Sequence, residues 1–457
     1  MKKLFTLLLL ITCGLSYGRT VTVPSWIDGT GATDVTGPLR AFFDGVRDTT
    51  TVVLPPGKTY RVEGILLLTS RKSLHIDLNG SRIIATTDGS KVDPNAYPSE
   101  FRWLWPRKRS QFAVRGSLNT WIYNGEITGA NPYNWTSDAA YNAAYEAQHN
   151  LDFEGCDGVQ LYKLKLSRPW GDFIYFGKWG HGNLQPTRNV TVTECEMHDN
   201  GRQGVSFAGA ENIVVTCNKI YNTRRSTFDI EPDAEGTGTK YLYIKNNFIG
   251  PGRLMFVASG GSTGGGISYV TIEGNVLLGR PMSIAMGGGA AGQRHHITIR
   301  NNTGDSTYLY GSPRALIEMV GVDYITVTGN KHWFAPMQRD DLPGEGNDAV
   351  QVDVGKAVYI NGNTWTGAER ASVLTGCTVA TAAFTVKSDF GITGIKKVLP
   401  VVSVGYSSGT AFPVLSKYKK YYQLLSDGKQ VDKGTLNAGY NTLPATGSVL
   451  QVATTTF

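Results

Sequence analysis

The chain has 457 residues with 55 glycines, and 18% of its residues are charged while 11% are aromatic. This composition excludes an intrinsically disordered chain and a small disulfide-stapled domain, and it is typical of a strand-rich globular protein. The formal net charge of +7 is compatible with an acidic polymer as partner, but it is too small to favour nucleic acid.

Residues 1–18 are predicted to form a signal peptide. Two lysines at positions 2 and 3 precede an apolar run over residues 4–11. The small residues Ser16 and Gly18 fit the cleavage rule and give a mature chain from Arg19. Because the apolar run is too short to span a membrane, the sequence predicts a secreted or periplasmic protein.

An alternative interpretation of the leader is a lipoprotein that is anchored to a membrane through Cys13. No later segment is long and apolar enough to predict a membrane span. The cysteines after the leader match no zinc-binding spacing, and the chain is too large to need a disulfide framework: Cys156, Cys195, Cys217 and Cys377. We expect Cys195 and Cys217 to be two buried free thiols; the alternative is that they are neighbours in the fold.

Short strand-like segments recur along the chain, each with an asparagine near its end, as in "IVVTCNKI" (213–220) and "LYIKNNFI" (242–249). Successive asparagines are 29, 28, 27, 28 and 33 residues apart, a period that predicts a solenoid of parallel strands. An asparagine at a tight bend can bond the backbone of the next coil. The column consists of Asn218, Asn247, Asn275, Asn302, Asn330 and Asn363.

A second short strand follows each bend, as in "DFIYFG" (172–177), "GVSFAG" (204–209) and "STFDIEP" (226–232). The hairpin signals of a propeller are missing. The pattern therefore predicts an all-β fold, a right-handed parallel β-helix whose coils are about 4.8 Å apart. The apolar residues of the second strands are expected in its core, among them Val205, Phe228, Ile230 and Ile317.

The predicted domain order is a β-helical catalytic domain over residues 19–370 and a small β domain over residues 371–457, where the asparagine column has ended. A short amphipathic helix at 35–46 is expected to cap the open end of the solenoid, since uncovered strand edges invite aggregation. Two insertions, at 97–112 and 131–150, interrupt the early coils and are expected to border the functional face.

The units "RPWGDFIYFG", "GRQGVSFAG" and "RRSTFDIEPD" resemble the pectin-lyase-like superfamily of secreted right-handed β-helix proteins, over roughly residues 45–370. The resemblance implies a polysaccharide hydrolase or lyase, or glycan binding on an outer sheet. One fold hosts many reactions, so the resemblance does not choose between them. The polygalacturonase motifs of the NTD, GDD, GHG and RIK type are not found.

Asp229 and Glu231 are the strongest catalytic candidates, because they alternate with apolar residues and therefore share one face of a strand. Their Cα atoms are expected about 6.6 Å apart, and carboxylates separated by about 6.5–9.5 Å suit an inverting glycosidase. Arg202 and Arg225 are expected to flank Asp229, to bind substrate and to bias the two pKa values. In the alternative interpretation, these arginines only form salt bridges with the acids.

The outward-facing residues of the second strands are expected to form a column along the solenoid. Within "WGDFIYF", Asp172 precedes its strand and is either an auxiliary carboxylate, like one of the acid triplet of polygalacturonases, or an ordinary turn residue. Glu318 belongs to the same face as Asp229. The predicted column reads Tyr175, Ser206, Asp229, Val257, Ala285, Glu318 and Asp353.

Further substrate contacts are expected from His149 and Tyr175, which would serve as base and acid in an elimination reaction; the alternative for His149 is a structural role. Trp103 and Trp105 share a loop with basic residues and would stack on sugar rings, unless they pack the loop onto the solenoid. No cofactor is expected. Calcium stays an open alternative, although no metal-binding loop of recognisable spacing is present.

These features predict a secreted polysaccharide-degrading enzyme, a glycoside hydrolase that acts on a glycan with or without acidic sugars. Asp229 and Glu231 would be its acid/base pair and Asp172 an auxiliary. A polysaccharide lyase that acts on uronic acids is one alternative. A non-catalytic glycan-binding adhesin or phage-type spike is the other, and it predicts that the acids are consumed in salt bridges.

Overall fold

The computed structural model describes residues 18–377 with internal gaps and, beyond them, the backbone of short strands only. The gaps within the first range are 103–104, 133–140, 181–183, 233–237, 251, 259–264, 278–283, 288–291, 307–314, 335–347, 367–371 and 376; the later described segments are 402–405, 411–414, 418–424, 430–435, 439–442 and 449–454.

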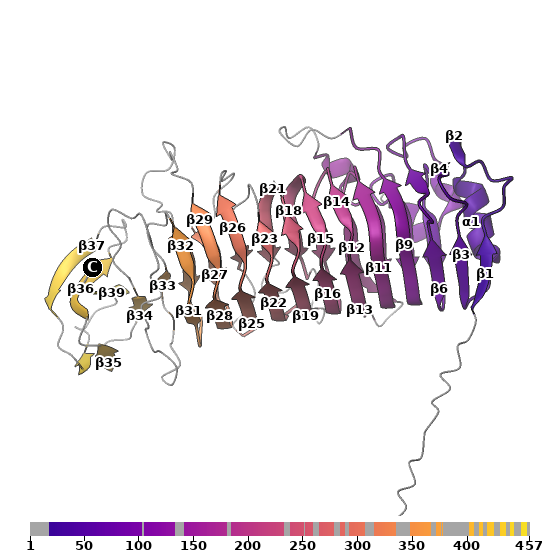
Figure 1. Ribbon diagram of the computed structural model, residues 1–457. Helices are drawn as coiled ribbons and strands as arrows, with labels where there is room; N and C mark the ends of the chain where they lie inside the picture. The colour runs from indigo at the N-terminus through magenta and orange to yellow at the C-terminus, as the bar shows by residue number, and fades with distance from the viewer. Residues whose placement is uncertain are drawn as a thin grey trace, which may run out of the picture.

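The described chain winds into a right-handed parallel β-helix, as predicted, with three parallel sheets that we call faces 1, 2 and 3 (Figure 1). Face 1 contains β1 (Arg19–Thr22), β3 (Thr50–Val53), β6 (Leu74–Asp77), β9 (Leu118–Thr128), β11 (Asp157–Ser167), β13 (Gln185–Thr193), β16 (Ala210–Thr216), β19 (Thr239–Lys245), β22 (Ile267–Glu273), β25 (Arg294–Arg300), β28 (Asp323–Thr328) and β31 (Tyr359–Asn361).

Face 2 continues from face 1 after a bend, and β9 and β11 extend into both faces. It contains β2 (Thr30–Asp34), β4 (Thr59–Arg61), β7 (Arg82–Ile84), β14 (Glu196–His198), β17 (Lys219–Tyr221), β20 (Phe248–Ile249), β23 (Val276–Leu277), β26 (Thr303–Ser306), β29 (Lys331–Phe334) and β32 (Thr364–Thr366).

Face 3 carries the second strands predicted from the sequence. It contains β5 (Leu66–Thr69), β8 (Phe112–Arg115), β10 (Leu151–Glu154), β12 (Ile174–Trp179), β15 (Val205–Phe207), β18 (Thr223–Ile230), β21 (Gly252–Ala258), β24 (Ile284–Met286), β27 (Ala315–Val320), β30 (Asp348–Asp353) and β33 (Val373–Thr375).

The core is a column of apolar side chains that the three faces enclose. Phe153, Phe176 and Phe207 stack on consecutive coils, with ring centroids 5.9 Å apart at each step. The predicted inward residues are confirmed, because each is 0% exposed: Val205, Phe228, Ile230 and Ile317. Burial of such large side chains on every coil supplies the main stabilisation of the solenoid.

The asparagine column forms the predicted ladder at the bend between faces 1 and 2. The backbone N–H and the side-chain amide of Asn247 donate to Oδ1 of Asn275, at 2.9 and 3.0 Å. The Nδ2 of Asn275 also donates to the carbonyl of Ile244 at 3.0 Å. The same pattern joins consecutive coils from Asn218 to Asn363, so each side chain satisfies buried backbone groups that water cannot reach.

Helix α1 (Thr36–Gly45) lies over the N-terminal end of the solenoid, where the prediction placed it (Figure 1). Its residues Leu39 and Phe43 are 1% exposed and join the core. The short helix η1 (Pro94–Ala96) precedes the first insertion, which contains α2 (Ser99–Arg102), and the second insertion contains η3 (Ala143–Tyr145).

The C-terminal strands pair antiparallel, unlike those of the solenoid. One sheet contains β34 (Val402–Gly405), β36 (Tyr418–Leu424), β37 (Gln430–Thr435) and β39 (Val449–Thr454), and a hairpin pairs β35 (Ala411–Val414) with β38 (Gly439–Thr442). The predicted boundary at residue 370 lies outside the described residues, as does the predicted signal peptide up to residue 17, and both stay predictions.

Among the described cysteines, Cys156, Cys195 and Cys377 are buried free thiols, which confirms the expectation for Cys195. Cys217 is also free but exposed, which corrects the expectation that Cys195 and Cys217 are both buried. Burial raises the pKa of Cys195 to about 12. In the part of the chain that the structure describes, no helix is long and apolar enough to cross a membrane.

Candidate active site

The outer side of face 3 places four candidate residues on consecutive coils. Asp152 of β10 pairs with Tyr175 of β12, Tyr175 with Ser206 of β15, and Ser206 with Asp229 of β18. The column then continues through Val257 and Ala285 as predicted. Because coils stack at about 4.8 Å, these polar side chains lie next to one another along the axis.

One position of the predicted column is wrong. Glu318 pairs with Gln351, whereas Asp353 pairs with Val320. Val350 and Val352 are both apolar and both buried, so a two-residue shift keeps the same kind of side chain inside. The sequence pattern alone therefore does not distinguish the two registers. Glu318 itself is three coils, or about 14 Å, from Asp229, so it is not part of the same cluster.

Asp229 is fully buried, although its side chain points to the outer side of the sheet; the expected exposed acidic face is therefore wrong. Neither carboxyl oxygen has a hydrogen-bond partner among the described residues. Burial, with the nearby charges of Glu231 and Asp172, raises the pKa of Asp229 well above its usual value. Desolvation disfavours the ionised form, so this carboxyl keeps its proton to a higher pH than an ordinary aspartate does.

Glu231 lies at the end of the same strand, and its side chain is 33% exposed. The Nη2 of Arg202 donates to Oε2 of Glu231 at 2.9 Å. The two acids therefore occupy different environments: one is enclosed and has a raised pKa, and the other is accessible and paired with a cation.

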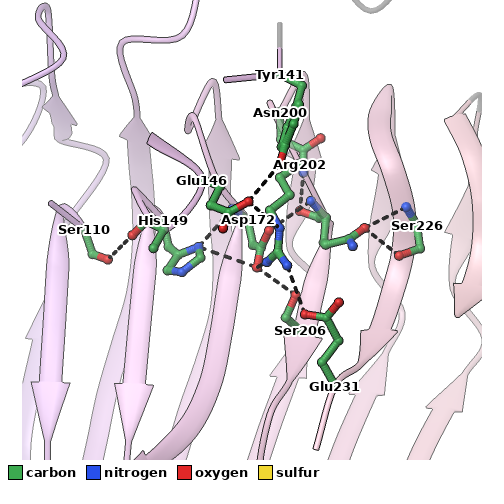
Figure 2. A network of polar contacts seen from close by, with 12 residues as sticks. Ser110, Tyr141, Glu146, His149, Asp172, Asn200, Arg202, Ser206, Ser226 and Glu231 are labelled. Atoms are coloured by element: carbon green, nitrogen blue, oxygen red, sulfur yellow. Dashed lines mark hydrogen bonds and ion pairs between the residues drawn. The ribbon is translucent and has the colours of Figure 1, made fainter. Parts of the chain in front are cut away.

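Arg202 joins the acids of three coils, and Figure 2 shows its guanidinium between them. Besides Glu231, it contacts Oδ2 of Asp172 at 3.2 Å and Oε2 of Glu146 at 4.0 Å. The charge of Asp172 is the largest cause that raises the pKa of Arg202. Arg202 is thus confirmed as a neighbour of the acid pair.

Asp172 is fully buried and accepts several hydrogen bonds. The backbone N–H of Gln203 donates to Oδ1 at 2.9 Å, and the hydroxyl of Ser206 donates to Oδ2 at 2.7 Å (Figure 2). With Arg202 as a third partner, this carboxylate is held between two coils. With its oxygens engaged by Gln203, Ser206 and Arg202, Asp172 has the geometry of a residue that positions Arg202.

Arg225 contacts the second insertion, and its predicted place beside Asp229 stays a prediction. Its guanidinium carbon lies 3.9 Å from the centre of the Tyr141 ring, a cation–π contact with the second insertion. The hydroxyl of Tyr141 donates to Oε2 of Glu146 at 2.8 Å. The insertion therefore engages both Arg225 and, through Glu146, Arg202.

The two insertions meet beside this cluster, as predicted. Arg107 of the first insertion forms an ion pair with Glu146 of the second. Trp105 packs within the first insertion: its ring stacks on Tyr97 with centroids 5.2 Å apart, and its indole N–H donates to the carbonyl of Gly89. This packing accounts for Trp105 without a sugar. Trp103 lies outside the described residues.

His149 and Tyr175 are brought together, with their rings stacked at 5.0 Å and nearly parallel. His149 is 4% exposed, and its Nδ1 accepts a hydrogen bond from the backbone N–H of Asp172 at 3.0 Å. Burial lowers the pKa of this histidine, so it is neutral. A base with its Nδ1 occupied and so little exposure is poorly placed to abstract a proton from a polymer.

Several residues of the site were missed in the sequence. Asp152 and Glu154 contact the buried Arg115, with Nη2–Oδ2 2.6 Å and Nε–Oε2 3.3 Å. The signal was present, because "LDFEG" (151–155) repeats the acid spacing of "FDIEP" (228–232). Glu146 had no comparable signal, because it lies in an insertion. Among the residues that the structure describes, no cluster of three or more His, Cys, Asp or Glu forms a metal site.

Comparisons with known proteins agree with this architecture. Residues 183–382 match the family model described as "right handed beta helix region". The structure of a family 28 exopolygalacturonase from Yersinia enterocolitica superposes with a TM-score of 0.57 at 16% identity, covering 84% of this chain and 77% of that chain. The protein has the pectin-lyase-like β-helix fold.

Two further structures illustrate the range of proteins with this pectin-lyase-like fold. The pre-mature form of gene product 12 of bacteriophage phi29 gives a TM-score of 0.54 at 14% identity, covering 77% of this chain and 46% of that chain. An exopolygalacturonase from Thermotoga maritima gives 0.49 at 11% identity, covering 95% of both chains. No significant match is found among curated protein sequences.

Proposed function

We propose that this pectin-lyase-like protein is a glycoside hydrolase that cleaves a polysaccharide with Asp229 and Glu231. The observation that carries the proposal is the contrast between the two carboxyls. Asp229 is enclosed and has a raised pKa, and Glu231 is accessible and paired with Arg202. Pairs of acids whose pKa values are pushed apart by their environments are the hallmark of an acid/base pair. The fold is shared with an exopolygalacturonase, which supports a polysaccharide substrate.

In the proposed reaction, Asp229 donates its proton to the glycosidic oxygen as the bond from the anomeric carbon to that oxygen breaks. Glu231 accepts a proton from a water molecule, whose oxygen forms the new bond to the anomeric carbon. In this scheme water attacks the anomeric carbon directly, without a glycosyl-enzyme intermediate, so we expect inversion of the anomeric configuration.

Arg202 and Asp172 position this pair. Arg202 pairs with the Glu231 carboxylate, and Asp172 holds Arg202 from the buried side. The second insertion contributes Glu146 and Tyr141 beside the same guanidinium groups. We expect these loops to border the substrate, since loops on a rigid scaffold commonly carry function. Export through the predicted signal peptide, residues 1–18, would bring the enzyme to extracellular glycans.

The test is to incubate the purified protein with a panel of polysaccharides and to record reducing ends together with the absorbance of unsaturated uronates. Reducing ends without absorbance are expected, and the product configuration is read by NMR. Asp229→Asn and Glu231→Gln should each lower turnover by about 10²–10⁴-fold. A folded double variant that keeps full hydrolytic activity would contradict the proposal, and unsaturated products would replace it with a lyase.

A second candidate is a glycan-binding protein without catalysis. It is supported by the ion pairs of Arg202 with Asp172 and Glu231, because these pairs account for both acids without any reaction. It predicts that no polysaccharide of the panel is cleaved, while glycan affinity falls when Arg202 is replaced.

A further inference from the structure

A second cluster of charged residues lies on face 3, on the N-terminal side of the proposed catalytic pair. Arg115 of β8 is 3% exposed and contacts both Asp152 and Glu154 of β10. Asp152 is 6% exposed, and its Oδ1 has no hydrogen-bond partner among the described residues. An unpaired buried carboxylate oxygen is costly, so a donor from outside the protein would be bound favourably there.

This cluster repeats the arrangement of the catalytic pair. Asp152 and Glu154 are two residues apart on their strand, as are Asp229 and Glu231, and an arginine contacts each pair. Asp152 also occupies the same outward column as Asp229, three coils away through Tyr175 and Ser206. The two clusters are therefore about 14 Å apart along the solenoid axis.

Two aromatic side chains frame the cluster. Trp179 lies across Gly116 and Gly155: an added Cβ would approach the Trp179 side chain within 2.4 Å at Gly116 and 2.9 Å at Gly155. Both glycines also have positive φ, so a side chain is disfavoured there by the backbone conformation as well as by the contact with Trp179. On the other side, Tyr175 and Glu154 both approach Gly177, within 2.6 and 3.1 Å of an added Cβ. Trp179 and Tyr175 are both partly exposed.

We propose that Asp152, Glu154, Trp179 and Tyr175 form a second sugar-binding subsite, which takes an uncharged sugar unit of the polysaccharide. This proposal rests on the proposed function for its polymer substrate and extends it by naming the chemical class of sugar at this position. The carboxylates would accept hydrogen bonds from sugar hydroxyls, and the aromatic side chains would contact the apolar face of the ring.

The charges of the cluster argue for a neutral sugar and against a uronic acid. The only guanidinium that contacts these carboxylates within the described residues is Arg115, and both acids already engage it. Burial, followed by the charge of Asp152, raises the pKa of Glu154 to about 7, although the charges of Arg115 and Lys108 act in the opposite direction. These two cations already compensate the carboxylates of the cluster, so a uronate carboxylate placed here would meet like charges at short range and would lose hydration without gaining a cation of its own.

The experiment measures binding in a chain that carries Asp229→Asn, so that the probes are not consumed. The probes are polygalacturonate, its carboxyl-reduced neutral derivative, and neutral galactan, glucan and mannan. Glu154→Gln and Trp179→Ala are each added to this chain and compared by affinity electrophoresis. Trp26→Ala and Glu211→Gln serve as matched controls, since Trp26 is exposed and Glu211 pairs with Lys240 on face 1.

We expect the parent to bind at least one neutral polymer, and more tightly than polygalacturonate. Each subsite variant should weaken this binding about tenfold, whereas the controls leave it unchanged. Glu154→Gln should also reduce the ratio of the affinity for the neutral polymer to the affinity for polygalacturonate. Tighter binding of polygalacturonate by the parent, no binding of any neutral polymer, or equal binding by all variants would overturn the subsite.

The two proposals fail separately in this design. If the chain with the native Asp229 cleaves nothing while the binding pattern is as expected, the hydrolase is contradicted and the subsite stands. If cleavage depends on Asp229 but the subsite variants bind like the controls, the subsite alone is contradicted.

Discussion

Asp229 and Glu231 stand two residues apart on one strand, yet the first side chain is 0% exposed and the second is 33% exposed. The charge of Glu231 adds to burial in raising the pKa of Asp229, while Arg202 lies beside both acids and lowers it. The raised pKa of Asp229 is therefore a property of the pair and its surroundings.

The rate of hydrolysis is expected to fall as the pH rises through the raised pKa of Asp229, because a deprotonated carboxyl cannot protonate the leaving group. The measurement is kcat as a function of pH on a cleaved polysaccharide. A rate that keeps rising into the alkaline range would show that Asp229 is not the acid.

Folding stability should depend on pH through the same group. The folded pKa of Asp229 is raised above its ordinary value of 3.8, so between the two values the folded state retains a proton that the unfolded state releases. Stability therefore falls as the pH rises through this window. Asp229→Asn removes this contribution. We expect it to raise Tm relative to the parent at about pH 9 and to change it little at about pH 4.

Glu154 also lowers the stability of the folded protein as the pH rises from its ordinary pKa of 4.5 to about 7. This contribution is the same in the parent and in Asp229→Asn, so it cancels when the two chains are compared. An Asp229→Asn variant that is less stable than the parent at alkaline pH would mean that the carboxyl is ionised and paired in the folded protein.

Arg202→Met is expected to destabilise the protein by about 3–5 kcal/mol, because it leaves the carboxylate of Asp172 buried without its cation. Asp172→Asn in the same chain should recover part of this loss, since it removes the uncompensated charge. Urea unfolding of the two single variants and the double variant gives the coupling between them. Simple additivity of the two single effects would show that the ion pair is not the cause.

Asn275→Ala should cost about 2–4 kcal/mol, because the backbone N–H of Asn247 and the carbonyl of Ile244 both lose a buried partner. Asn95→Ala is the control, since Asn95 is exposed and surface substitutions usually change stability by less than about 0.5 kcal/mol. The free energies of unfolding are compared in urea. Equal stabilities of the two variants would contradict the role of the ladder.

Thiol labelling of the native mature chain should begin at Cys217, which is exposed. Cys156 and Cys195 are buried, and burial raises the pKa of each thiol to about 12, so their reactive thiolate is scarce. Peptide mapping after brief treatment with a maleimide identifies the modified residue. Early labelling of Cys195 would show that this bend opens in the native state.

The fold could be predicted because its strongest signal is local and repeated. The asparagine spacing and the alternation of residues such as Phe228 and Ile230 require only the sequence of each coil. The register between coils was harder to predict. In β30, Val350 and Val352 both fit the inward position that pairs with Ile317, so the sequence predicts Asp353 at the place where Gln351 lies. A period of two fixes which side a residue faces, and it does not fix the offset between coils.

The site was predictable only in part for the same reason. Sequence alternation showed that Asp229 and Glu231 face outward together, and it placed Arg202 beside them. It could not show that Asp229 is buried, because covering an outward side chain depends on residues that are distant in the chain. The contact of Arg225 with Tyr141 likewise comes from an insertion that has no repeat pattern.

The asparagine ladder has a direction, and this direction bears on how the chain assembles during synthesis. The amide and backbone N–H of Asn218 donate to Asn247, which lies on the coil that follows it, and every later step points the same way. A nascent chain that leaves the ribosome N-terminus first therefore always ends in an asparagine whose donors await a coil not yet made. Each newly formed coil accepts the hydrogen bonds of these donors and ends in an asparagine whose own donors need the coil after it. Winding from the N-terminus forward is therefore favoured at every stage.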